Sequence, residues 1–383
     1  MRPDTLGGPR QPAFWLFLTL LGISAIGIGA EHLSYVQAFP GAWLLSISLM
    51  TVIALPAIVL VRRFDRFEPE PVSMVIYALL WGGLVAYFFS GVANNAMLGG
   101  VQKLLSPQAF ADWAAAIVAP TNEEFYKTVG LLVLFLIARR EFDGVMDGLV
   151  YGAMIGLGFQ AVENVQYFIE AARLAGVGGQ ISAVTGTFVV RVGIAGLYSH
   201  TLFSGLSGAG FAYAVTRRDR PAARRVLVFA GLLLTGWGAH FVWNSPLFSS
   251  IASGHDLLSF VALALLKGVP FLALLVLLAL HARRREAAAF ACIVWPEVGT
   301  DVISREELRA LSTVRGRARA LKEAGRELGR AGRRLERSLQ TEQLKLGLVE
   351  ARATGADDLA VEAQRSRIRR IREEMAALAP KSA

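Results

Sequence analysis

Cysteine and charged side chains are both scarce in this sequence of 383 residues. The single cysteine, Cys292, excludes a disulfide within the chain and any zinc site built from several thiolates. Charged residues make up 18% of the chain, against about 25% in an ordinary globular domain. Hydrophobic residues make up 54%, and the mean hydropathy is +0.47. A water-soluble globular protein is therefore excluded.

Several familiar catalytic motifs are also missing. The sequence has no HExxH pair, no Walker loop and no GxSxG elbow. The most easily recognised zinc peptidases, nucleotide-binding proteins and serine hydrolases are thus not indicated. Any chemistry has to come from polar residues in another arrangement.

The sequence does contain long apolar runs. Crossing about 30 Å of hydrocarbon takes roughly 20 helical residues, and eight runs before residue 283 approach or exceed that length. They predict an all-α fold, a polytopic transmembrane helix bundle of about eight spans. The runs cover residues 14–30, 42–61, 72–98, 114–137, 145–169, 181–215, 226–248 and 257–280.

Basic residues in the short connections predict the orientation of the bundle. Arginines gather in alternate connections, around residues 2–10, 62–66, 139–140, 217–225 and 283–285, whereas the intervening connections hold only Lys103 and Arg173. Because basic loops stay in the cytoplasm, both termini are expected there. A cleaved signal peptide is the alternative for the first run, but no clear small-residue cleavage site follows it.

The composition changes after the eighth run, which suggests two domains, 1–282 in the membrane and 283–383 as a charged cytoplasmic tail. The tail carries most of the net charge of +9. Leu321, Leu328, Leu335 and Leu339 recur at helical spacing, and residues 353–356 interrupt the pattern. A helical hairpin or short coiled coil is predicted. It is either a solvated tail, an arm that self-associates or binds a cytoplasmic protein, or a patch resting on anionic lipid.

Ionisable residues within the apolar runs are the candidates for function, because each costs about 2.5 to 3.5 kcal/mol on insertion scales. Glu123, Glu124 and Lys127 stand together in the fourth run. Pro120 suits a helix start, with Thr121 or Asn122 as its cap. The simpler interpretation of this segment is a capped helix end with one surface ion pair.

Later runs add Glu163 with Asn164, then His200, then His240 with Asn244 four positions on. Glu163 has no basic residue one helical turn away, so its charge needs a partner on another helix or a metal. A lone membrane histidine is more often a packing residue, but two histidines with three glutamates on adjacent helices favour a site. Gly148, Gly152 and Gly156 form a smooth stripe that predicts close helix packing.

The positions of these residues along alternating helices place all five ionisable groups in the outer half of the membrane. Asn94 and Asn95 would reach the same level as wall or cap residues, whereas Lys267 is expected to pack or snorkel. A glutamate can deprotonate water, and a histidine or an amide can stabilise an oxyanion, so peptide hydrolysis fits this set. Zinc held by Glu163, His200 and His240 is the competing way to activate the water.

Four motifs in this order resemble the PrsW family of intramembrane proteases, relatives of the CAAX-processing and bacteriocin-processing membrane endopeptidases. They cover about residues 70–250 and comprise Glu123-Glu124-x-x-Lys127, the run from Asp147-Gly148 to Glu163-Asn164, Ser199-His200, and His240-x-x-Trp243-Asn244.

The resemblance implies an endopeptidase of the bacterial membrane, and the best-known member of the family cleaves a membrane-bound anti-sigma factor at its extracytoplasmic side. It also implies catalytic roles for Glu123, Glu124, Glu163, His200 and His240. Some members carry an acidic residue where this chain has Asn244, and an amide cannot act as a carboxylate base.

The residues and the resemblance together predict an intramembrane endopeptidase of the bacterial inner membrane that cuts a single-pass protein, with no nucleic acid as partner. Glu123 or Glu124 is the expected base and Lys127 balances the charge of the pair. Glu163, Asn164, His200 and His240 hold a metal or the polarised water, and Asn244 fixes the ring of His240. A proton-coupled transporter using the same cluster, or a noncatalytic scaffold acting through its tail, are the alternatives.

Overall fold

The computed structural model describes residues 10–63, 67, 69–194, 199–252, 257–353 and 358–378. Within these ranges every named element is a helix, and one isolated bridge joins Val298 and Ile303. The prediction of an all-α protein is confirmed. The chain forms two compact units, Met1–Asp65 with Glu70–Ala282 and Arg66–Pro69 with Arg283–Ala383.

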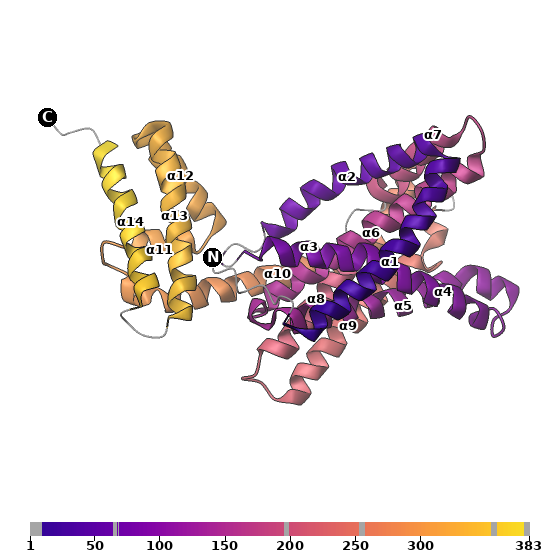
Figure 1. Ribbon diagram of the computed structural model, residues 1–383, viewed down its shortest axis with the longest axis horizontal. Coiled ribbons are helices and arrows are strands. Elements are labelled where there is room, and N and C mark those ends of the chain that lie inside the picture. Colours follow the sequence, from indigo (N-terminus) through magenta and orange to yellow (C-terminus); the bar gives the residue numbers. More distant parts are fainter. Residues whose placement is uncertain are drawn as a thin grey trace. The chain divides into compact units, whose positions relative to one another are not determined.

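The first unit is a bundle of long helices, shown from indigo to orange in Figure 1. Two short 3-10 turns, η3 (Arg139–Glu141) and η5 (Ser249–Ala252), accompany them, together with the π-helical η4 (Val189–Ile194), which directly follows Phe188. The helices are α1 (Pro12–Ala38), α2 (Pro40–Arg62), α3 (Val72–Leu80), which continues through the π-helical η2 (Trp81–Ala86) into α4 (Tyr87–Val101), α5 (Pro107–Ile137), α6 (Val145–Ala175), α7 (Gln180–Phe188), α8 (Ser199–Thr216), α9 (Ala222–Asn244) and α10 (Leu257–Ile293), of which the residues up to Ala282 belong to this unit.

Seven stretches of the described chain are long and apolar enough to cross a membrane. Five are the single helices α1, α2, α6, α9 and α10, one runs from α3 through α4, and one is Gln180–Thr216, around α7 and α8. A polytopic helical membrane protein is thereby confirmed. The remaining predicted span lies in α5, which is 31 residues long but carries Glu123, Glu124 and Lys127 in its middle and is therefore less apolar.

The start of α5 was predicted wrongly. The helix begins at Pro107, where the Ser106 hydroxyl accepts a hydrogen bond from the Ala109 amide, and Pro120 lies inside it. Thr121 donates to the Ile117 carbonyl and caps nothing. The two glutamates consequently sit in the middle of a buried helix, which rules out a capped end with a surface ion pair.

Helices α6 and α8 pack backbone against backbone. A Cβ atom at Gly148, Gly152 or Gly156 would collide with the carbonyl oxygen of Gly208, Ser204 or His200, respectively. The predicted packing role of this stripe is confirmed, and small residues are what allow such an approach. Because α8 lies so close, His200 is held beside the half of α6 that carries Glu163.

Replacing Gly152 by alanine is expected to destabilise the bundle by about 1 to 3 kcal/mol, because the new methyl group overlaps a backbone carbonyl that cannot turn away. The matched change Gly22→Ala in α1 meets no atom within 4 Å, so it should be neutral or slightly stabilising. Unfolding of the detergent-solubilised proteins by titration with SDS measures both. Equal stability of the two variants would contradict this packing.

The second unit is a small helical bundle with its own core. After η6 (Trp295–Glu297) come α11 (Arg305–Leu311), α12 (Val314–Glu327), α13 (Gly329–Arg352) and α14 (Leu359–Leu378), the last three side by side in Figure 1. Gly329 breaks the helical stretch at a positive φ of 66°, a turn that the leucine pattern did not predict. The core includes Phe290, Val294, Ile303, Leu339, Leu346 and Ile368.

Glu350 gives the stability of this second unit a pH dependence. Burial, together with the neighbouring carboxylate of Glu297, raises the pKa of Glu350 to about 7. Since the folded state holds this proton more tightly than the unfolded state, stability should fall as the pH rises from about 4.5 through 7. The side chain is half-buried, so we expect a loss on the order of 1 kcal/mol.

Hydrogen exchange of α13 in the detergent-solubilised full chain, corrected for intrinsic rates, should therefore show less protection at pH 8 than at pH 6. Glu350→Gln should remove most of that difference, because a neutral amide does not titrate. An unchanged pH dependence in the variant would show that another group is responsible.

Candidate functional site

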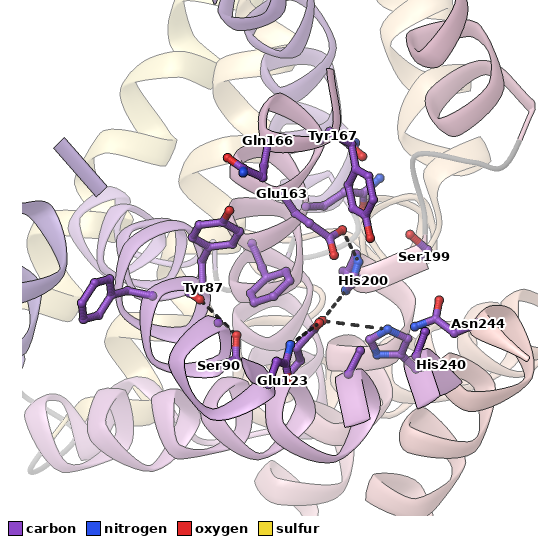
Figure 2. A pocket seen from close by; sticks show the side chains of 18 of the residues that line it. Tyr87, Ser90, Glu123, Glu163, Gln166, Tyr167, Ser199, His200, His240 and Asn244 are labelled. Atoms are coloured by element: carbon purple, nitrogen blue, oxygen red, sulfur yellow. Dashed lines mark hydrogen bonds and ion pairs between the residues drawn. The ribbon is translucent and has the colours of Figure 1, made fainter. Parts of the chain in front are cut away.

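The polar residues of the spans meet at a cavity of about 640 Å³ in the first unit. Figure 2 shows Glu123, His200 and His240 facing one another, with Glu163 beside His200 and Asn244 beside His240. Helices α5, α6, α8 and α9 supply these side chains, and α4 and η4 add further wall residues. The polar and charged residues of its wall include Glu31, Asn94, Asn95, Glu123, Glu163, Asn164, Arg191, His200, His240 and Asn244.

Lys127 lies at the centre of the cluster and is 1% exposed. Its Nζ is 2.9 Å from Glu124 Oε1, 3.3 Å from Glu123 Oε2 and 2.8 Å from His200 Nδ1. The ring of Phe159 lies below it, with its centroid 3.9 Å away. A buried ammonium needs such partners, so Lys127 neutralises the glutamate pair, as the sequence predicts.

Each nitrogen of His200 has an assigned role. Because an ammonium only donates hydrogen bonds, Nδ1 accepts from Lys127 and the ring proton lies on Nε2. Nε2 donates to Glu163 Oε2 over 3.0 Å. The partner on another helix that the sequence required for Glu163 is thus His200, together with Arg191, whose Nη2 is 3.2 Å from the same oxygen.

His240 is fixed by a different glutamate. Its Nδ1 lies 3.0 Å from Glu124 Oε1 and donates to that carboxylate, and its ring stacks on Phe203 at a centroid distance of 4.7 Å. No hydrogen bond joins Asn244 to His240 among the described side chains, so the expected role of Asn244 in holding this ring is taken by Glu124 and Phe203. Asn244 itself lines the cavity.

The two adjacent glutamates differ in their access to the cavity. Glu123 lines it, and its Oε2 is 3.9 Å from His240 Nε2 and 3.8 Å from His200 Nδ1. Glu124 is absent from the wall and uses its oxygens on Lys127, His240 and Ser204. Of this pair, Glu123 is the residue that lines the cavity.

One group in the described chain has the composition of a metal site. Ligand atoms of Glu123, His200 and His240 all lie within 4.8 Å of one another, and all three residues are buried. His200 and His240 were predicted as ligands. The third predicted ligand, Glu163, instead contacts His200 Nε2, the ring nitrogen on the opposite side from Lys127. A carboxylate and two imidazoles suit zinc by donor type.

Sequence reasoning missed Arg191. It lies in η4, within the sixth apolar run, and lines the cavity. Its side chain donates hydrogen bonds to Glu163 and Asn164 and packs on the ring of Tyr167. An arginine inside a predicted span is a signal that could have found it. Asn94 was placed correctly as a wall residue, and its amide nitrogen is 3.5 Å from Glu123 Oε1.

Lys267 has a structural role, as predicted. Its Nζ donates to the carbonyl oxygens of Trp243 and Ser245, at 3.3 Å and 2.6 Å. These carbonyls lie at the C-terminal end of α9, where cations are favourable. The contact holds the end of the helix that carries His240 and Asn244.

Comparison with known proteins points to one family. The model described as PrsW family intramembrane metalloprotease matches residues 70–281. Protease PrsW of Geobacillus kaustophilus (strain HTA426) is 28% identical over 190 residues, 49% of this chain and 74% of that protein. Protease PrsW of Bacillus subtilis (strain 168) is 29% identical over 120 residues, 30% and 50% of the two chains. No solved structure matches the chain.

Proposed function

The chain belongs to the PrsW family of intramembrane proteases, and from that premise we propose that it hydrolyses a peptide bond of a membrane-anchored protein with a water molecule activated by Glu123. The observation that carries this proposal is the unequal placement of the glutamate pair, since Glu123 lines the cavity and Glu124 does not.

Charge balance supports Glu123 as the base. Arg191 pairs with Glu163, and Lys127 lies closer to Glu124 than to Glu123. Two cations thus face three carboxylates. Glu123 and Glu163 both line the cavity, but Glu163 holds Arg191, whereas Glu123 shares Lys127 with the closer Glu124, so Glu123 is the carboxylate that can take a proton.

In the proposed reaction the water contacts both Glu123 Oε2 and His240 Nε2. The ring proton of His240 lies on Nδ1, which donates to Glu124, so Nε2 carries no proton and can accept a hydrogen bond from the water. Glu123 accepts a proton as the water oxygen bonds to the scissile carbonyl carbon. The amide of Asn244 donates to the resulting oxyanion. When the carbon–nitrogen bond breaks, Glu123 returns the proton to the leaving nitrogen.

A metal does not fit the cluster as it stands. Zinc would need lone pairs of Glu123, His200 and His240, but Lys127 Nζ already occupies His200 Nδ1 and lies 3.3 Å from Glu123 Oε2. A divalent ion at those atoms would face this buried ammonium at close range, where repulsion is strong. We therefore propose glutamate-type catalysis without zinc.

Removal of metal is accordingly expected to leave activity intact. Purified protein treated with a strong chelator should cleave its substrate at the untreated rate, and elemental analysis should find much less than one zinc per chain. Stoichiometric zinc, with activity lost on chelation and restored by zinc, would overturn the metal-free mechanism while leaving the protease assignment in place.

The proposed substrate is a single-pass protein of the bacterial inner membrane, such as an anti-sigma factor. The arginine-rich connections favour a cytoplasmic location of both termini, and this orientation is part of the proposal. His240 lies in the last two turns of α9, at the end opposite such a connection, so cleavage would occur in the outer half of the bilayer. The tail would self-associate or bind a cytoplasmic protein, and no nucleic acid is expected.

Co-expression with epitope-tagged single-pass proteins tests this function directly. We expect a shortened product from at least one candidate anti-sigma factor, cut on the outer side of its span. If a panel of such proteins stays intact while the protein carries protons with a solute in proteoliposomes, the cluster serves transport instead.

A further inference from the structure

Arg191 and Asn164 form a polar pair on the cavity wall that the proposed reaction does not use. Arg191 Nε donates to Asn164 Oδ1 over 3.1 Å, and Nη2 donates to Glu163 Oε2 over 3.2 Å. The guanidinium carbon lies 3.4 Å from the centroid of the Tyr167 ring. Three contacts therefore fix the orientation of this side chain.

The bond from Arg191 also fixes the orientation of the Asn164 amide. A guanidinium can only donate, so the atom that faces it has to be the amide oxygen. The amide nitrogen Nδ2 therefore faces away from Arg191, and it is buried without an acceptor among the described residues. Asn164 is only 2% exposed and lines the cavity, so this donor lacks a partner in a place where nearly all buried donors have one.

Arg191 contributes a second free donor group. Its side chain is 31% exposed, and because Nε and Nη2 are engaged by Asn164 and Glu163, Nη1 is the donor that it can offer to a molecule in the cavity. The positive charge is already balanced by Glu163, so the pair does not call for an anion. What both donors lack is an uncharged acceptor.

We propose that Asn164 and Arg191 bind a main-chain carbonyl oxygen of the substrate, next to the scissile bond. This rests on the proposed function. A membrane-spanning substrate is helical, and cleavage requires a locally extended segment whose carbonyls lose their helical donors. Unpaired carbonyls are costly in an apolar setting, and the two free donors satisfy one of them. This contact does not depend on which side chains the substrate carries.

Thioamide substitution tests the contact, because sulfur accepts hydrogen bonds more weakly than oxygen. Purified full-length protein would be given synthetic transmembrane peptides from a sequence that the wild type cleaves, each with one carbonyl near the cleavage site replaced by a thiocarbonyl. We expect one position, other than the scissile carbonyl, to lower kcat/KM of the wild type about 10-fold.

The proposal predicts that the effect of the thioamide in the peptide depends on Asn164 in the protein. The decisive measurement therefore repeats the thioamide comparison with variant proteins. In Asn164→Ala the thioamide penalty at that position should shrink to less than about 2-fold, since the partner is gone. Asn95→Ala, the same truncation at an exposed asparagine of the same wall, should keep the full penalty. Arg191→Lys, which retains a charge for Glu163, should reduce the penalty in part.

An equal penalty in the wild type and Asn164→Ala, or no sensitive position near the cleavage site, would overturn the subsite. If Asn164→Ala does not fold, Arg191→Lys decides by the same comparison. If the wild type cleaves no peptide or protein at all, the proposed function fails, and that result is distinguishable because it appears before any variant is made.

Discussion

Glu123→Gln is expected to lower the rate of substrate cleavage by about 1,000-fold, because the amide cannot take a proton from the attacking water. Glutamine has nearly the same shape, and its single carbonyl oxygen can keep the hydrogen bond from Lys127, whereas the bond from Asn94 to the other oxygen is lost. The measurement is single-turnover cleavage by purified protein in detergent or liposomes. Accumulation in the membrane serves as the control for folding.

Glu124→Gln is the matched comparison at the next residue. This change weakens the contact that sets the tautomer of His240 and removes the closer partner of Lys127, but leaves the cavity carboxylate in place. We expect a loss of about 10- to 100-fold. If both variants lose activity equally, or if Glu124→Gln loses more, the assignment of Glu123 as the base is wrong.

Lys127→Met is expected to have the largest effect on stability. The change removes the cation that lies between Glu123 and Glu124, so two adjacent carboxylates remain buried without it. Breaking such a buried pair costs about 3 to 5 kcal/mol. Poor accumulation in the membrane and early unfolding in an SDS titration would register the loss, and cleavage should be undetectable.

A triple variant separates charge from shape. A protein with all three changes, Glu123→Gln, Glu124→Gln and Lys127→Met, has no ionised group at these positions. Most of the stability lost in Lys127→Met should therefore return, while cleavage stays absent. Replacing all partners of a buried ionic group is often nearly neutral. A triple variant as unstable as Lys127→Met alone would show that the ammonium matters for its packing on Phe159 and not for its charge.

The membrane helices were predictable because hydrocarbon imposes a minimum apolar length that sequence displays directly. The start of α5 was not predicted, since Gln108 and Asp112 interrupt the apolar pattern although Ser106 and Pro107 form an ordinary helix start. Pro120 favours a helix boundary by its local preference, but it lies inside α5. Tertiary packing can override that local preference.

The residues of the site were largely predictable, but their separate roles were not. Carboxylates and imidazoles are conspicuous in apolar runs, so Glu123, Glu163, His200 and His240 could all be named in advance. Whether Glu123 or Glu124 faces the cavity depends on the rotation of α5 about its axis, which a sequence does not reveal. The free amide nitrogen of Asn164 likewise exists only because Arg191 arrives from η4.

The contact between α6 and α8 limits how a substrate can enter. Along Gly148, Gly152 and Gly156 the two helices meet through main-chain atoms, so no side chain can change rotamer to widen the gap. The α6–α8 contact is therefore expected to stay closed. An opening for a substrate is therefore expected at another wall of the cavity, such as the one that α4 lines.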